Sequence, residues 1–485
     1  MRNAVLLVLG LLTAGATVAV AFATPGGSTG PSSSDSPYLI RAKPGVVMKS
    51  ILTVGDAVTK AGGEPGDVYR MVGKPDGLGA FDNGDGTFTL LMNHELGGGA
   101  GVVRAHGAPG SFVSRWVIRK DDLSVVEGED LIESVATWNV SLSRHNAPAS
   151  GITLRDLCSA TLPPRSALYN EATGNGYDGR IFMGGEEVNT GRAFGHLLDG
   201  TTYELPALGK ASWENQVAHA DTGDNTVVVG LDDTTTGGQV YVYVGDKKAE
   251  GNPVERAGLT GGTLHGIKVE GYPTEPADTG IPSGTAFTGH SFGDVSARTA
   301  SQLNSASIAA GVTLFQRPED GVWATANPND FYFATTANFN GKSRLWRLRF
   351  EDPTDPAKGG TISMVLDGTE SEGYHQLDNM TANERGRLIL QEDPGNNARL
   401  ARVWQYDTAS DALEELAKAD PDRFDAPEPP FTQTEESSGV IDVSDLLGEG
   451  WYLLDFQAHY PKPDTELVEG GQLLAMHVPP GRPVE

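Results

Sequence analysis

Leu388-Ile389-Leu390-Gln391-Glu392-Asp393-Pro394 is the stretch that decides the fold, because its order of residues recurs along the chain. Three large apolar residues lead into two adjacent carboxylates, and a proline ends the run. A short apolar run of this kind predicts a buried strand, so its polar end should open onto a cavity. Two neighbouring carboxylates there repel each other unless a cation or shared protons neutralise them.

Five other segments repeat this order of turn, apolar strand and polar end. They are residues 88–95, 180–187, 226–233, 331–338 and 451–459. Six sheets arranged radially would bring the six polar ends together if each apolar strand were the innermost one, lining a central channel. We therefore predict an all-β fold, a six-bladed β-propeller, with small helical surface insertions at residues 301–310 and 409–419.

Short polar loops form a second series that precedes these strands. They cover residues 75–77, 213–215, 317–321, 377–379 and 434–439, and residues 156–159 hold the corresponding place before the second strand. In a propeller, a loop at this position crosses the mouth of the channel before the chain enters the inner strand. Acidic residues are common in ordinary turns, so one loop alone says little. Their recurrence favours a shared site at the mouth.

The composition limits the partners. The chain has 485 residues and a net charge of −28, from 64 acidic and 36 basic side chains. Nucleic acids and anionic membranes require a positive surface, so we expect neither as a partner. The acidic surplus suits a secreted protein that holds divalent cations, and solubility or a salty habitat explains it equally well. No internal linker is visible, so we expect residues 38–485 to form one domain and the protein to be a monomer.

The N-terminal segment is typical of export. Residues 1–23 predict a secretory signal, with Arg2 before an apolar core and Ala21-Phe22-Ala23 as the cleavage pattern. Left uncleaved, the same segment would anchor the protein in a membrane. Residues 24–37 predict a flexible spacer. No later stretch is long and apolar enough to span a bilayer, so we expect a secreted protein, extracellular or periplasmic.

Cys158 is the chain's single cysteine and cannot form an internal disulfide. A free thiol outside the cell is an oxidation hazard. Either Cys158 is a small buried residue, or its thiolate is a metal ligand. Its position within the loop series favours the ligand.

The remaining candidate ligands are carboxylates at the strand ends and in the loops. They are Glu95, Glu186, Glu187, Glu214, Asp232, Asp233, Glu319, Asp378 and Glu436. So many oxygen ligands, without paired cysteines or closely spaced histidines, indicate Ca²⁺ or Mg²⁺ rather than structural zinc. A thiolate beside carboxylates would add a softer metal such as iron.

The candidate catalytic residues are Arg317, Glu392 and Asp393. A metal-bound phosphate substrate would also need an arginine fork, and Arg317, directly before Pro318-Glu319, is the best placed. Glu392 and Asp393 are the adjacent carboxylates of the opening stretch. The sequence contains neither a Gly-x-Ser-x-Gly elbow nor a phosphate-binding Walker loop, which leaves serine-hydrolase and nucleotide-loop chemistries without support.

Several of these segments resemble one family. Cys158-Ser159-Ala160, followed by residues 179–187 with Glu186-Glu187, resembles the cysteine segment and Glu-Glu strand of the PhoX-type secreted alkaline phosphatases. Asn93-His94-Glu95 resembles that family's Asn-His-Glu strand end, and residues 317–320 and 377–379 are similar to its later acidic loops. The resemblance runs in patches from about residue 75 to about residue 459.

This resemblance implies a six-bladed propeller whose channel holds iron (Fe³⁺) and several Ca²⁺ ions and which hydrolyses small phosphate monoesters. Cys158, Glu214 and Glu319 would then be iron ligands, and the other acids calcium ligands. Two features depart from the family pattern: the signal has a single Arg2 instead of a twin arginine, and Gly185 stands where a second cysteine is common. The resemblance is therefore to a divergent member.

Two other functions fit the same residues. A calcium-dependent lactonase or phosphotriesterase propeller would use central Ca²⁺ and would not need Cys158. A non-catalytic secreted binding scaffold would use the metals only to stiffen the channel. The phosphatase hypothesis requires a substrate-sized opening with an arginine beside the metals, whereas the scaffold hypothesis predicts a plugged channel.

Overall fold

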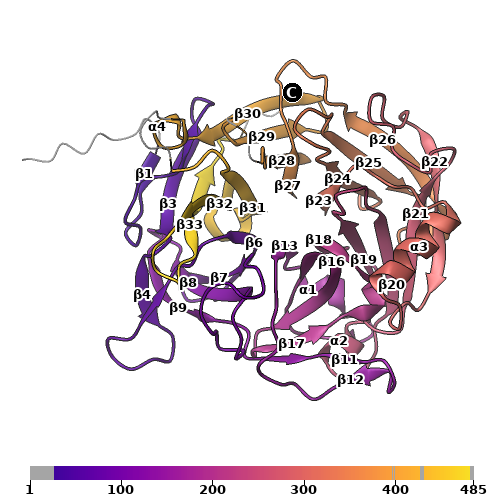
Figure 1. The fold of residues 1–485 in the computed structure, drawn as a ribbon, viewed down its shortest axis with the longest axis horizontal. Helices are drawn as coiled ribbons and strands as arrows, with labels where there is room; N and C mark the ends of the chain where they lie inside the picture. The colour runs from indigo at the N-terminus through magenta and orange to yellow at the C-terminus, as the bar shows by residue number, and fades with distance from the viewer. Residues whose placement is uncertain (1–26, 396, 398, 426–430, 481–485) are drawn as a thin grey trace, which may run out of the picture.

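Six blades of β-sheet stand around a central channel in the computed structural model (Figure 1), which describes residues 27–395, 397, 399–425 and 431–480. The innermost strand of each blade contacts the innermost strands of the two neighbouring blades, so the ring is closed. The predicted all-β, six-bladed propeller is confirmed. The predicted signal segment, residues 1–23, lies outside the described residues.

The innermost strands are not the ones that the sequence predicts. They are, from blade 1 to blade 6, β6 (Pro75–Asp82), β13 (Leu157–Thr161), β18 (Lys210–Ala218), β23 (Pro318–Trp323), β27 (Leu377–Ala382) and β31 (Glu436–Asp442). These strands begin in the residues that the sequence predicts to be loops, so the loop assignment was wrong.

The apolar segments form the second strand of each blade. These are β7 (Thr87–His94), β16 (Ile181–Leu197), β19 (Asn225–Asp232), β24 (Asp330–Thr335), β28 (Arg387–Glu392) and β32 (Trp451–Pro461). A second strand is covered on both faces by neighbouring blades, so it can be apolar throughout. An innermost strand faces the channel and carries more polar residues. The prediction of buried strands was correct, but their order from the axis was wrong.

Outer strands complete the blades. Blade 1 adds β8 (Phe112–Arg119), β9 (Val125–Asp130), β4 (Ala57–Lys60) and β5 (Val68–Arg70), and blade 2 adds β17 (Thr201–Glu204) and β10 (Ser134–Ala136). Blade 3 adds β20 (Val240–Asp246) and β21 (Thr263–Val269), and blade 4 adds β25 (Arg344–Phe350) and β26 (Gly360–Leu366). Strand β22 (Thr285–Gly293) pairs with both β21 and β26 and so joins these two blades. Two small hairpins, β11–β12 (Trp138–Asn139, Arg144–His145) and β14–β15 (Tyr169–Asn170, Asn175–Gly176), lie apart from the blades.

Both ends of the chain build the last two blades. Blade 5 consists of β27 and β28 with β29 (Arg402–Asp407), β30 (Ala412–Ala419) and the N-terminal β2 (Leu39–Arg41); blade 6 adds β33 (Glu469–His477), β3 (Val47–Thr53) and β1 (Gly27–Thr29). Strand β3 pairs antiparallel with β33, and β1 pairs parallel with β3. The predicted spacer at residues 24–37 was therefore wrong for its described part, because β1 belongs to the sheet that closes the ring.

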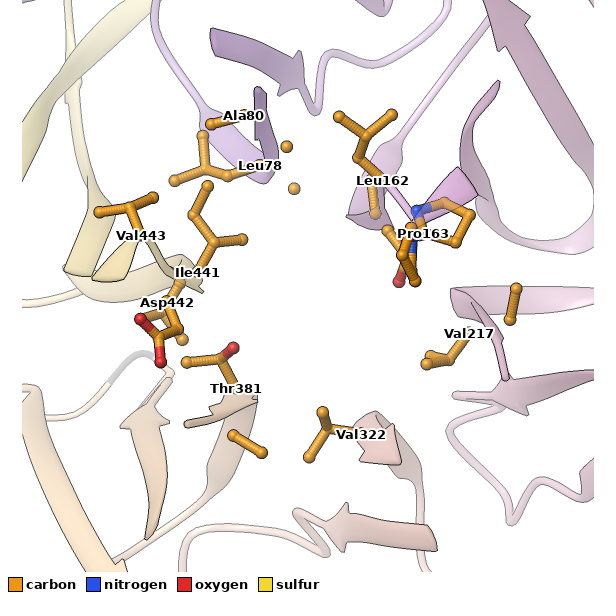
Figure 2. Close-up of a pocket in the computed structure, with 18 of the residues that line it drawn as sticks. Leu78, Ala80, Leu162, Pro163, Val217, Val322, Thr381, Ile441, Asp442 and Val443 are labelled. Atoms are coloured by element: carbon orange, nitrogen blue, oxygen red, sulfur yellow. The ribbon is translucent and has the colours of Figure 1, made fainter. Parts of the chain in front are cut away.

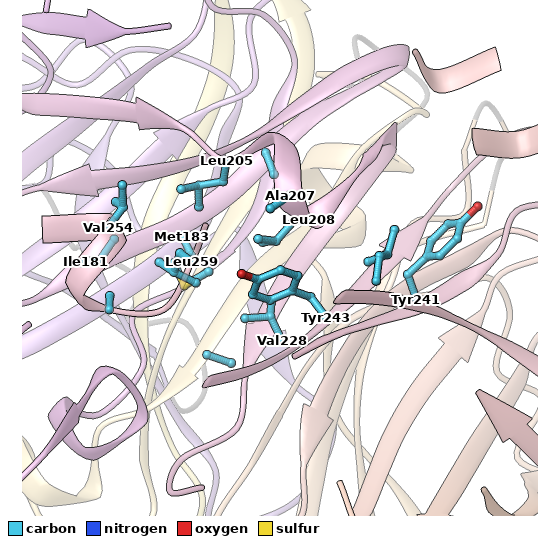
Figure 3. Close-up of a cluster of buried hydrophobic side chains, with 14 of the residues drawn as sticks. Ile181, Met183, Leu205, Ala207, Leu208, Val228, Tyr241, Tyr243, Val254 and Leu259 are labelled. Carbon is cyan, nitrogen blue, oxygen red and sulfur yellow. The ribbon is translucent and has the colours of Figure 1, made fainter. Parts of the chain in front are cut away.

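The hydrophobic core lies between adjacent blades rather than on the channel axis. Figure 3 shows the cluster between blades 2 and 3, where Ile181 and Met183 of β16 pack near Val228 and Tyr243. The buried Tyr243 hydroxyl donates a hydrogen bond to the Gly258 carbonyl, 2.9 Å away, which satisfies its polar end. Each blade is thus buried against its neighbours and depends on them for its stability.

Helices are few and short. They are α1 (Arg165–Leu168), α2 (Pro253–Arg256), α3 (Ala300–Ala310), α4 (Pro421–Phe424) and α5 (Ser444–Leu447), with 3₁₀ turns at Pro206–Leu208 and Pro356–Lys358. Helix α3 lies on the outer rim, as predicted (Figure 1). The second predicted helix, residues 409–419, was wrong, because Ala412–Ala419 is the outer strand β30. None of the helices in the described part of the chain is long and apolar enough to cross a bilayer.

Candidate metal centre in the channel

A β-bulge interrupts the pairing of every innermost strand with its second strand, close to its first residues. The bulges lie between Pro75 and Leu78, Leu157 and Ala160, Trp213 and Asn215, Pro318 and Gly321, Leu377 and Met380, and Ser438 and Val440. A bulge turns its unpaired residue away from the regular alternation and re-aims its side chain. Five bulges carry a metal-ligand type, Asp76, Cys158, Glu214, Glu319 and Asp378, and the sixth carries Gly439.

These five side chains come together with Glu95, which directly follows β7, and Glu187, which lies within β16. The seven groups, which we call the channel cluster, form three overlapping triads: Asp76 with Glu95 and Cys158, Cys158 with Glu187 and Glu214, and Glu214 with Glu319 and Asp378. The ligand atoms of each triad lie within 4.8 Å of one another. The cluster therefore spans five blades.

The cluster is buried enough to make its charges costly. Glu214 is 1% exposed and Glu319 is 3% exposed. Burial first, and neighbouring carboxylates second, raise the pKa values of Asp76, Glu187, Glu214, Glu319 and Asp378 well above the usual carboxyl range. Burial and the charge of Asp76 likewise raise the pKa of the Cys158 thiol. Without a cation, this geometry favours protonated carboxyl groups.

Unpartnered oxygens indicate that the cluster suits a metal ion. Glu214 Oε1 is buried and has no hydrogen-bond partner among the described residues. Both carboxylate oxygens of Asp455, which is fully buried, and of Glu435 are also without partners in that part of the chain. Buried polar atoms are normally satisfied, so these oxygens point to a bound species. Oxygen-rich donor sets suit Ca²⁺, and the Cys158 thiolate, with Sγ 3.5 Å from Asp76 Oδ2, suits a softer metal such as iron.

Two cationic side chains border the cluster. Lys74 Nζ lies 3.0 Å from Glu95 Oε2. Arg317 grips Asp233 with two hydrogen bonds, Nε to Oδ1 at 2.8 Å and Nη2 to Oδ2 at 2.6 Å, and its Nη2 lies 3.4 Å from Glu319 Oε1. Arg317 keeps 29% of its side chain exposed, so it borders the site and remains accessible from the mouth.

Four residues at the mouth have a strained backbone conformation. Lys74, Asp156, Arg317 and Gln376 each lie two residues before a bulge ligand, and their φ angles are 49°, 45°, 61° and 38°. Non-glycine residues in this left-handed region cost on the order of 1–2 kcal/mol each. The recurrence at four blades indicates that the turn into the bulge is required to aim the ligand that follows.

A further acidic group lies where blades 5 and 6 meet. Burial and the charge of Glu436 raise the pKa of Asp393 to about 7. Glu436 is itself buried, but hydrogen bonding to His459 lowers its pKa to about 2, while its carboxylate and that of Glu469 raise the pKa of His459 to about 10. Asp393 also raises the pKa of Asp378. This group therefore adjoins the channel cluster and holds a carboxyl that titrates near neutrality.

The paired acids at the strand ends divide into two roles. Glu186 is held by Arg192, with Nε to Oε2 at 2.8 Å, and Glu392 by Arg399, with Nη2 to Oε1 at 2.7 Å. Asp232 accepts hydrogen bonds from the backbone of Ser212 and from Thr234. The expectation that these three face the channel was wrong, because successive residues of a strand point to opposite faces.

The second member of each pair is the one near the site. Glu187 belongs to the cluster, Asp233 holds Arg317, and Asp393 adjoins Asp378. Glu392 is fully buried against Arg399 and Trp404, so its loss would act on stability rather than on the reaction.

Sequence reasoning missed three residues. Asp76 lies in the predicted loop at residues 75–77 and is not among the predicted ligands, although it occupies the same bulge position as they do. Lys74 is not among the predicted site residues. Gln457 donates through Nε2 to Asp76 at 3.0 Å and to Glu95 at 3.1 Å. The loop series contained the signal for Asp76, whereas nothing in the sequence marked Gln457.

A polar floor closes the channel directly behind the cluster. It consists of the residues that follow four of the bulge ligands, Ser159, Asn215, Asp320 and Asn379, all buried. Asn379 of blade 5 donates to the Ser159 hydroxyl of blade 2, across the channel. Asn215 donates to Asp320 at 2.6 Å, and the Met380 backbone N–H donates to the same carboxylate at 3.1 Å. The cluster is therefore reached from one mouth only, where Glu187 and Asp378 are partly exposed.

Fold and site together define a six-bladed propeller with a metal-ligand cluster at one mouth of its channel. Among solved structures, PhoX of Pseudomonas fluorescens in complex with vanadate, a transition state analogue, matches with a TM-score of 0.62 at 13% identity, covering 90% of this chain and 95% of that chain. This match shows that the two proteins share a fold.

Looser matches include a protein of unknown function from Dyadobacter fermentans, with a TM-score of 0.41 and 8% identity over 90% of this chain and 100% of that chain. The GH93 α-L-arabinofuranosidase of Fusarium graminearum matches with a TM-score of 0.37 and 6% identity over 90% and 98%. No protein-family model and no curated protein matches the sequence.

The raised carboxyl pKa values predict how stability depends on pH. The folded, metal-free protein holds protons that the unfolded chain has released, so its unfolding free energy falls as pH rises through the folded pKa values. In a chelator, we expect the melting temperature to drop by several degrees from about pH 7 to about pH 9, above the usual histidine range. Added calcium should remove most of the drop, because it neutralises the same carboxylates.

Thermal melts with and without chelator measure this dependence of the melting temperature on pH and calcium. A melting temperature that is independent of pH and calcium in demonstrably metal-free protein would contradict the interpretation.

Proposed function

We propose that this protein is a secreted, metal-dependent phosphomonoesterase that acts at the channel cluster. The observation that carries the proposal is the convergence of six carboxylates and one thiol from five blades beside Arg317. The propeller fold is shared with a PhoX captured with a transition state analogue, and the Cys158 and Glu-Glu segments resemble the PhoX-type alkaline phosphatases. We propose calcium for the one triad made of carboxylates alone, Glu214, Glu319 and Asp378, and iron for the two triads that share Cys158.

Metal held in the cluster would polarise a phosphoryl oxygen and activate a water molecule. The chain's own residues supply the remaining steps. Arg317 presents a partly exposed guanidinium whose orientation is fixed by Asp233, as recognition of a phosphate requires. Asp393, whose pKa is about 7, can accept a proton from water at alkaline pH. The floor of Ser159, Asn215, Asp320 and Asn379 keeps bulk water from entering behind the substrate.

The partly exposed Arg317 and Lys74 beside the cluster favour an enzyme over a scaffold. A channel crossed by a floor is what the scaffold hypothesis expects, but this floor lies behind the cluster and leaves its mouth side accessible at Arg317 and Lys74. An arginine beside the ligands is what the phosphatase hypothesis expects. Cys158 distinguishes the proposal from a lactonase or phosphotriesterase propeller, which needs carboxylates alone.

Hydrolysis of aryl phosphate mono-, di- and triesters and of a lactone, measured side by side at alkaline pH with calcium and iron supplied, tests the substrate class. We expect the monoester to be preferred and Arg317→Gln to lower kcat/KM by roughly 100-fold, because one fixed donor to the developing charge is lost. Arg349→Gln is the matched control, since Arg349 also grips an aspartate with two hydrogen bonds but lies on an outer strand. A preference for the lactone or the triester would contradict the proposal and would instead assign the protein as a lactonase or a phosphotriesterase.

Cys158→Ser tests the iron assignment. The substitution replaces a soft thiolate by a hard neutral hydroxyl, so we expect iron and the thiolate-to-iron absorption band to disappear while the protein stays folded. Visible spectra and iron content of both proteins measure this, with the monoesterase rate beside them. A colourless wild type together with an equally active Cys158→Ser protein would refute the iron site and leave the calcium assignment intact.

A further inference from the structure

A second cavity occupies the channel on the far side of the floor. It has a volume of about 650 Å³ and reaches from Ser159, Asn215 and Asp320 to the opposite mouth. We call it the distal chamber (Figure 2). The floor separates it from the channel cluster, so a substrate of the cluster does not need it. Its volume lies in the range of small-molecule binding sites.

The wall of the distal chamber is a ring of six side chains, one from each blade, of which five are aliphatic and the sixth is Thr381. Figure 2 shows these side chains, from Leu78, Leu162, Val217, Val322, Thr381 and Ile441, arranged around the opening. We call this ring the collar. Each innermost strand turns polar groups to the cluster at its start and apolar groups to the chamber further along. Apolar surface facing a water-filled cavity is unfavourable, so the collar favours an apolar occupant.

Carboxylates gather at the rim between blades 5 and 6. Asp442 lies beside Ile441 and Val443 of the wall (Figure 2), and Glu384 and Asp445 line the same cavity. Burial and the charges of Asp445 and Glu384 raise the pKa of Asp442, which places the three groups near one another. Asp442 accepts a hydrogen bond from the Ser444 backbone at 2.7 Å, which leaves its other oxygen available.

The other charged side chains of the wall do not cancel the negative charge of this rim. Five carboxylates and two guanidinium groups line the cavity. Arg165 is neutralised by Asp178, and Asp82 by Lys120. Arg180 stacks on Phe81, with its guanidinium carbon 4.7 Å from the ring centre. Burial lowers the pKa of Arg180, and the charge of Asp445 opposes this shift. The chamber therefore combines a collar of five aliphatic side chains with a negative rim.

We propose that the distal chamber binds a small amphipathic organic cation, with its apolar body inside the collar and its charged head at Asp442 and Glu384. The shape, the apolar wall and the sign of the rim select this class. An amphipathic anion would meet three carboxylates and a single unneutralised arginine. The floor would hold this ligand apart from the channel cluster, so its binding should leave the rate at the cluster unchanged.

Calorimetric titration of the full-length protein with three probes that share a ten-carbon chain tests the proposal: decyltrimethylammonium and decanoate, kept below their micelle concentrations, and decanol, kept below its solubility limit. We expect saturable equimolar binding of the cation, weakened by salt, and binding of decanoate weaker by about tenfold or more. Decanoate binding as tightly as the cation, or no saturable binding of the cation, would overturn the proposal.

Variants show whether the cation binds in the chamber or only to the negatively charged surface of the protein. Asp442→Asn keeps the hydrogen bond to Ser444, and Glu384→Gln changes a rim residue; each should weaken the cation severalfold. Thr381→Lys places a positive charge in the collar and should abolish binding. Val322→Trp fills the collar with a larger side chain and should abolish binding as well. Asp121→Asn, on the outer surface and paired with Arg119, should change nothing. Equal affinities in wild type, Asp442→Asn, Glu384→Gln and Thr381→Lys would show adventitious binding to the surface only and refute the site.

Discussion

Repulsion among buried carboxylates is the constraint on which this structure depends. Six carboxyl groups and a thiol from five blades lie in overlapping triads, mostly out of reach of water. Lys74 and Arg317 touch only the edge of this group, so they cannot neutralise it alone. The cluster must hold protons or metal ions. The protonated and the metal-bound protein differ in stability and in the chemistry that the cluster can support. Bound metal would relieve the same crowding that otherwise destabilises the ring.

The propeller provides this crowding through a repeated local device. Each innermost strand enters the channel through a bulge, and four of the entries begin at a strained, left-handed residue. In blades 2 to 5 the bulge residue belongs to the cluster, the next residue belongs to the floor, and a residue beyond it belongs to the collar. One short strand segment thus specifies the metal ligands, the closure behind them and the wall of the distal chamber. Closure of the ring by β3 and β33 then fixes all six segments relative to one another.

The sequence predicted the class of fold because apolar runs with polar ends recur six times, and this pattern depends only on burial. It could not predict the order of strands from the axis, since an innermost strand that lines the channel carries polar residues and glycines and therefore reads as a loop. The sequence placed candidate ligands in the cluster where a lone acid marks a bulge, as at Glu214 and Asp378. It could not separate Glu186 and Glu392 from the adjacent acids, because which of two neighbours faces the channel depends on strand register and on an arginine partner such as Arg399.

The central claim is that the channel cluster holds metal through carboxylates that include the buried Glu214. The most direct measurement is the calcium and iron content, by elemental analysis, of the wild-type protein and of Glu214→Gln, purified identically with both metals supplied. Glu214 belongs to two of the three triads and has an unpartnered oxygen, so the account predicts metal in the wild type and a large loss of it in a folded Glu214→Gln protein. A wild-type protein free of metal, or a Glu214→Gln protein with the full content, would contradict it.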